Sequence, residues 1–114
     1  MKKGQSFHDH VVRDLLAHLP EITSRVMFGG WGLYQSGVIF GIIAGGELYF
    51  KVDDTNRADF ERSGSQPFVY AQGNRKPAAM SYWAVPGEIM EHKEKLREWV
   101  ERSARVSRRA RRGK

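Results

Sequence analysis

The segment from Arg25 to Asp53 limits the possible folds of this chain more than any other feature. Its β-branched and aromatic residues come in short runs, each the length of a β-strand. The dipeptides Ser36-Gly37 and Gly45-Gly46 separate the last three runs, and glycine tolerates the positive φ that a tight hairpin needs. The pattern therefore predicts an antiparallel meander, with strands over residues 26–28, 32–35, 38–44 and 47–52.

Helical patterns and two further strands flank the meander. Apolar residues recur at helical spacing near the N-terminus, and Ser6 with Asp9 resembles a capping box, so we expect a first helix there. A short helix capped by Asp53 or Asp54 follows the meander. Residues 67–71 and 78–83 then read as strands, and an amphipathic helix ends the domain. The order α-β-β-β-β-α-β-β-α predicts an α+β fold.

Charge is distributed unevenly along the chain. Residues 1–101 hold 13 acidic and 12 basic residues, whereas the last 13 residues hold seven basic residues and no acid. Like charges repel and cannot form a core, so we expect a domain over residues 1–103 and a disordered basic tail over residues 104–114. Such a tail either binds polyanions such as DNA or RNA or only keeps the chain soluble. The candidate nucleic-acid-binding residues are Arg102, Arg105, Arg108, Arg109, Arg111, Arg112 and Lys114.

Composition excludes several classes of protein. At 114 residues the chain is long enough for one compact domain. It has no cysteine, so it forms no disulfide and no zinc–thiolate site. The sequence does not begin with a secretory signal pattern, and no apolar run approaches the roughly 20 residues of a membrane span. We therefore expect a cytoplasmic protein that does not enter the membrane.

No pattern of catalytic or metal-binding residues stands out. His8 and His10 are two positions apart, and a helix would point them roughly 200° away from each other, so we expect two solvated histidines. The glycines within residues 29–32 match no phosphate-loop pattern, and their expected role is a bulge, a turn or close backbone contact. We expect no catalytic residue, no metal and no cofactor, and we expect that the protein is not an enzyme.

Three motifs resemble those of a known family. Arg-x-Met-Phe-Gly-Gly-x-Gly-Leu-Tyr begins at Arg25, Leu-Tyr-x-Lys-Val-Asp at Leu48, and Met-Ser-Tyr-x-x-Val-Pro at Met80. Together they resemble the N-terminal domain of the TfoX/Sxy competence regulators, over about residues 7–103. The family-motif residues include Arg25, Met27, Phe28, Gly29, Gly30, Gly32, Leu33, Tyr34, Lys51, Met80, Ser81, Tyr82 and Pro86.

The resemblance implies a two-layer sandwich of an antiparallel sheet and helices, without a cofactor. It also implies a non-catalytic role in competence-type transcription regulation, together with a transcription factor. We expect the sheet face or its aromatic edge to contact a protein partner or a second copy of the chain. Full regulators carry a second, helical domain after this one. The present sequence has only an Arg-rich tail there, so we expect a stand-alone N-terminal domain. Two alternatives remain open: a direct nucleic-acid binder that uses the tail, and an enzyme or small-molecule binding protein with a pocket near residues 29–31 and 81–83.

Overall fold

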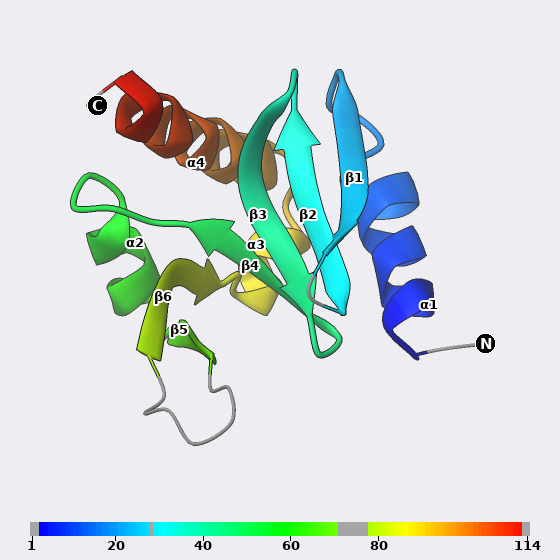
Figure 1. Ribbon diagram of the computed structural model, residues 1–114, viewed down its shortest axis with the longest axis horizontal. Helices are drawn as coiled ribbons and strands as arrows, with labels where there is room; N and C mark the ends of the chain where they lie inside the picture. The colour runs from blue at the N-terminus through cyan, green and yellow to red at the C-terminus, as the bar shows by residue number, and fades with distance from the viewer. Residues whose placement is uncertain (1–2, 28, 71–77, 113–114) are drawn as a thin grey trace.

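An antiparallel sheet forms the centre of the molecule. The structure is a computed structural model that describes residues 3–27, 29–70 and 78–112 (Figure 1). Within these residues, six strands form one sheet in the order β1-β2-β3-β4-β6-β5, and every neighbouring pair is antiparallel. The strands are β1 (Ile22–Met27), β2 (Gly30–Gln35), β3 (Val38–Ala44), β4 (Glu47–Lys51), β5 (Pro67–Tyr70) and β6 (Ala78–Ala84). The predicted meander is therefore confirmed as the run from β1 to β4.

Helices pack against this sheet. They are α1 (Lys3–Asp9), the π-helical η1 (His10–Leu15), α2 (Arg57–Arg62), α3 (Gly87–Met90) and α4 (Lys93–Arg112). The longest helix, α4, contacts β3 and β4, while α1 contacts β3 and η1 contacts β1. In Figure 1 the sheet is seen from the side opposite α4, which passes behind it. The structure confirms the α+β fold.

One hydrophobic core fills the space between the sheet and the helices. Leu33, Phe40 and Phe50 are completely buried there, and the rings of Phe40 and Phe50 meet edge to face with centroids 5.6 Å apart. Leu96 and Val100 of α4 belong to the same cluster. The apolar stripe of the last helix therefore packs against one face of the sheet.

A register shift between β2 and β3 decides which side chains reach the core. Leu33 pairs with Gly41, whereas Tyr34 pairs with Ile39, so Phe40 is an extra residue accommodated by a β-bulge. Side chains alternate between the faces on each side of the bulge. Phe40 and Leu33 therefore point into the core, and Tyr34 points to the opposite face.

Two glycines allow close approach between strands. A Cβ at Gly30 would lie 2.0 Å from the carbonyl oxygen of Ile43, and a Cβ at Gly41 would lie 2.5 Å from that of Tyr49. No side chain fits at these distances unless the backbone moves. The expected structural role of the glycine segment is confirmed for Gly30, and Gly29 adopts a positive φ of 75° just before β2.

The first helix differs from the prediction. It begins at Lys3, so Ser6 lies within α1 and does not cap it. The helix then widens, and the amide of Leu16 donates to the carbonyl oxygen of Val11 at 2.9 Å, five residues earlier. The predicted start of the helix at Ser6 was therefore wrong, because the capping-box pattern lies inside a longer helix.

The expected disorder of the tail is wrong for residues 104–112. Helix α4 continues without a break to Arg112. Its last turns bury Ala104 and Val106, and Ser103 Oγ donates to the carbonyl oxygen of Lys51 at 2.8 Å. Composition suggested a segment too charged to pack, but the small and apolar residues between the arginines lie on one helix face and dock on the domain.

Candidate functional site

The face of the sheet opposite α4 carries polar and aromatic side chains from four strands. We call this set the open face, and it consists of Arg25, Tyr34, Tyr49, Lys51 and Tyr82. Side chains alternate between the two faces of a sheet, so Tyr34, Tyr49 and Lys51, which are next to core residues in their strands, point away from the core. Arg25 and Tyr82 pair across the sheet with Gly32 and Lys51 and therefore lie on the same face. All five residues are partly or largely exposed. These five motif residues come from parts of the sequence up to 57 positions apart, and the sheet order places them on one face.

The first half of the open face joins β1 to β2. The guanidinium carbon of Arg25 lies 5.8 Å from the centroid of the Tyr34 ring, within the range of a cation–π contact. Gly32, the strand partner of Arg25, leaves space beneath them, because a Cβ there would lie 2.9 Å from Met27 Sδ and 3.2 Å from the Tyr34 ring. Four residues of the first motif thus form one packed unit.

The second half joins β4 to β6. Lys51 Nζ lies 4.8 Å from the centroid of the Tyr82 ring and donates a hydrogen bond to Ser81 Oγ at 2.8 Å. Burial lowers the pKa of Lys51 below its usual value, although the charge of Asp53 partly opposes this. The cation–π contact with Tyr82 and the hydrogen bond to Ser81 hold the ammonium group in place.

The tyrosines connect the two halves. Tyr34 of β2 and Tyr82 of β6 lie on the same face of the sheet; burial raises the pKa of Tyr82, and the electrostatic influence of Tyr34 raises it further. Tyr49 lies beside Phe68 of β5, with ring centroids 4.9 Å apart, and burial raises its pKa too. The open face therefore carries three tyrosines and two cations, each of which lies over a ring.

The remaining motif residues have structural roles or lie outside the described part of the chain. Leu33 is buried in the core, and Pro86 stands at the N-terminus of α3 with φ −61°. Phe28 and the side chain of Met80 lie outside the described residues.

The basic residues of α4 fall into two groups. Arg102 forms an ion pair with Asp59 of α2 at 2.5 Å, and Arg109 bonds to Thr55 Oγ1 at 2.6 Å and to Asp53 at 3.3 Å. These pairs tie α4 to α2 and to the turn after β4. Arg105 and Arg108 have no ion-pair or hydrogen-bond partner among the described residues. The side chains of Arg111 and Arg112, and all of Lys114, lie outside the described residues.

His8 is not solvated, contrary to expectation. Its ring stacks on Trp31 with centroids 4.6 Å apart, its Nε2 lies 2.8 Å from Ser24 Oγ, and its side chain is only 16% exposed. His10 is exposed and pairs with Asp14. The spacing of the two histidines correctly predicted that their rings do not lie together. It did not predict that His8 contacts Ser24 of β1 and Trp31 of β2. No group of three potential metal-binding side chains occurs in the part of the chain that the structure describes.

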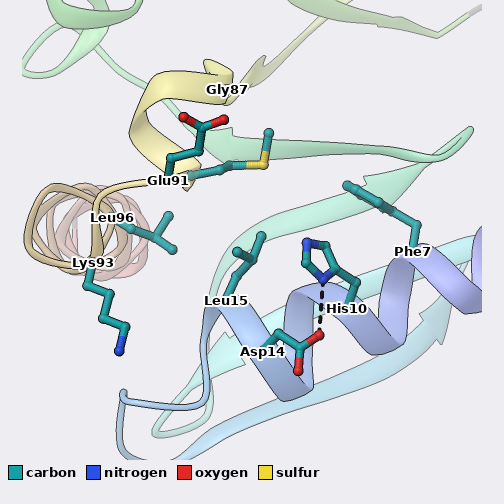
Figure 2. A pocket seen from close by; sticks show the side chains of 9 residues that line it. Phe7, His10, Asp14, Leu15, Gly87, Glu91, Lys93 and Leu96 are labelled. Carbon is teal, nitrogen blue, oxygen red and sulfur yellow. Dashed lines mark hydrogen bonds and ion pairs between the residues drawn. The ribbon is translucent and has the colours of Figure 1, made fainter.

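A hollow of about 480 Å³ lies between the N-terminal helix and the α3–α4 corner (Figure 2). Its apolar lining comes from Phe7, Leu15, Met90 and Leu96. Figure 2 shows His10 between Phe7 and Leu15, with its hydrogen bond to Asp14 of 3.1 Å. The hollow is not where the small-molecule alternative placed a pocket. Sequence reasoning missed it because segments about 75 residues apart line it.

Comparison with known proteins identifies the family. A search of curated proteins found no match to this chain. Among the residues described by the structure, no helix is long and apolar enough to cross a membrane. The family model of the TfoX N-terminal domain matches residues 14–107, which include all three motifs and most of α4. The chain therefore belongs to the TfoX N-terminal domain family.

Proposed function

We propose that the chain is a non-catalytic module of transcription regulation, of the competence type that its family suggests, and that it binds a protein partner through the open face. One observation carries the proposal. Residues from all three family motifs lie on the face of the sheet opposite α4, where Arg25 contacts the ring of Tyr34 and Lys51 contacts the ring of Tyr82.

The chemistry of the open face favours a protein partner. Arginine and tyrosine are enriched at interfaces, because they bury large areas and also make polar contacts. The two cations lie over rings, which fixes their positions before binding and lowers the entropy cost of association. A partner surface with carboxylates beside apolar side chains would complement this pattern, and a transcription factor is the partner class that the family suggests.

Site-specific photo-crosslinking in the native cells tests this proposal. Benzoylphenylalanine would replace Tyr49 or Tyr82 on the open face, and Glu98 on the exposed side of α4 would serve as the control position. We expect a covalent adduct with a transcription regulator from the open-face positions alone, lost in an Arg25→Glu background. Transcripts that respond to the wild-type chain should stop responding to Arg25→Glu. Adducts of equal yield at Glu98, or an unchanged transcript response, would contradict the proposal.

A hydrolase is a second candidate, because Lys51 donates to Ser81 Oγ at 2.8 Å and serine–lysine pairs activate the hydroxyl group in some hydrolases. A panel of nitrophenyl esters distinguishes the two functions. Turnover that disappears in Ser81→Ala would favour the hydrolase. A rate equal to that of buffer alone is the result expected for a binding module.

A further inference from the structure

We propose that the C-terminal half of α4 is a nucleic-acid contact surface that binds the phosphate backbone through Arg105 and Arg108. This surface is a fixed helix face and not a flexible arm. The inference concerns a surface separate from the open face and does not depend on the protein partner proposed above.

Ion pairs within the domain select these two arginines. Arg102 and Arg109 are engaged by Asp59 and Asp53, so a phosphate would have to compete with a carboxylate for them. Arg105 and Arg108 have no acidic partner in the described part of the chain. Their charges are therefore available to an external anion without loss of an internal contact.

The opposite side of the helix fixes the direction of these side chains. Ser103, Ala104, Val106 and Ser107 are all buried against the domain. Arg105 and Arg108 are three positions apart, so they are neighbours on the helix surface. Arg105 is exposed and Arg108 is partly exposed. Docking of the helix thus presents two adjacent cations to solvent.

The charge of α4 is divided along its length. The acidic residues of the helix, Glu94, Glu98 and Glu101, all lie in its first half. From Arg102 onward the sequence of the helix holds only basic, small and apolar residues, and Arg111 and Arg112 add to the basic count in the last turn. The positive potential is therefore concentrated at one end of the molecule.

A nucleic acid fits this surface better than a peptide groove or a membrane does. A peptide or a lipid surface needs exposed apolar side chains beside the cations. Among the described residues, the large hydrophobic side chain with high exposure is Val26, on β1 and not on α4. Duplex DNA carries one charge per about 1.7 Å of axis, so two arginines about 4.5 Å apart along a helix can meet neighbouring phosphates.

Fluorescence anisotropy of a labelled 24-base-pair DNA duplex with the full chain, from about 50 to 300 mM salt, tests the proposal. The test variant is Arg105→Gln/Arg108→Gln. The matched control is Lys93→Gln/Lys95→Gln, which removes the same charge from exposed positions in the first turn of the same helix. Circular dichroism checks that both variants fold.

We expect Arg105→Gln/Arg108→Gln to weaken binding at 100 mM salt on the order of tenfold or more, and to reduce the log–log salt slope by about 1.8, since each phosphate contact contributes about 0.9. The control should bind within about twofold of the wild type. Equal losses in the two variants, no binding by the wild type, or equally tight binding to vesicles rich in phosphatidylserine would overturn the proposal.

Discussion

At the scale of single residues, Gly41 sets the distance between β3 and β4. An alanine Cβ there would lie 2.5 Å from the carbonyl oxygen of Tyr49 and 2.9 Å from the Phe50 ring. The backbone of β4 would have to move to relieve this overlap, which costs free energy. We expect Gly41→Ala to lower the free energy of unfolding by about 1–3 kcal/mol, as overpacking does. Urea unfolding measures this effect. Gly87→Ala is the control, because a Cβ at Gly87 meets no atom within 4 Å, and a comparable loss there would contradict the explanation.

The carboxyl group of Asp53 should make the stability of the protein depend on pH in the acidic range. Burial acts to raise its pKa, but hydrogen bonds from Thr55 and Arg109 and the charge of Arg109 outweigh burial and hold the pKa below its usual value. A lowered folded-state pKa stabilises the protein above the unfolded-state value, and this stability is lost as the pH falls through the folded-state value. Between about pH 5 and 3, the free energy of unfolding should therefore fall less steeply in Asp53→Asn than in the wild type. Thr55→Ala should shift the curve in the same direction, and curves parallel to that of the wild type would contradict this role.

At the scale of secondary-structure elements, two serines one turn apart test how the end of α4 is held. Ser103 Oγ donates to the carbonyl oxygen of Lys51 at 2.8 Å, whereas Ser107 Oγ is buried without a partner among the described residues. We expect Ser103→Ala to cost about 1 kcal/mol and Ser107→Ala to be neutral or stabilising by up to about 1 kcal/mol, since an unpaired buried hydroxyl is unfavourable. Thermal unfolding gives both values, and the opposite order would show that α4 docks differently.

The elements also show how far the sequence predicts this fold. The hairpins between β2, β3 and β4 follow from local glycine turns, and they appear as predicted. Strand β1 begins at Ile22, four residues earlier than expected, because pairing with Gln35 extends it beyond its own β-branched run. The helical path of residues 104–112 depends on the burial of Ala104 and Val106 and on the contacts of Arg109 with Asp53 and Thr55, which charge composition cannot reveal.

The candidate site was predictable in its residues but not in its geometry. The sequence motifs contain Arg25, Tyr34, Lys51 and Tyr82. That these side chains share one face of the sheet depends on the pairing of β4 with β6 and on the bulge at Phe40. A one-residue change in register moves every following side chain to the other face of the sheet. No local pattern in the sequence announces that bulge.

At the scale of the whole molecule, α4 packs on one face of the sheet and the open face is the other, and Figure 1 shows α4 passing behind the strands. Distant sites without shared contacts act additively, and exposed charges more than about 8 Å apart are screened from each other at physiological salt. We therefore expect Tyr34→Ala to abolish open-face crosslinking while it leaves the dissociation constant for duplex DNA within about twofold of the wild type.

The reciprocal variant completes this test. Arg105→Gln/Arg108→Gln should lose DNA affinity and keep the open-face adduct at wild-type yield. Anisotropy and crosslinking on the same two protein preparations measure both effects, with the unfolding midpoint as a check on folding. A module that joins a protein partner to nucleic acid requires this independence, because both ligands must be able to bind at once. If Tyr34→Ala weakened DNA binding as much as the arginine variant does, the two surfaces would form one site, and the separate assignment of α4 would be wrong.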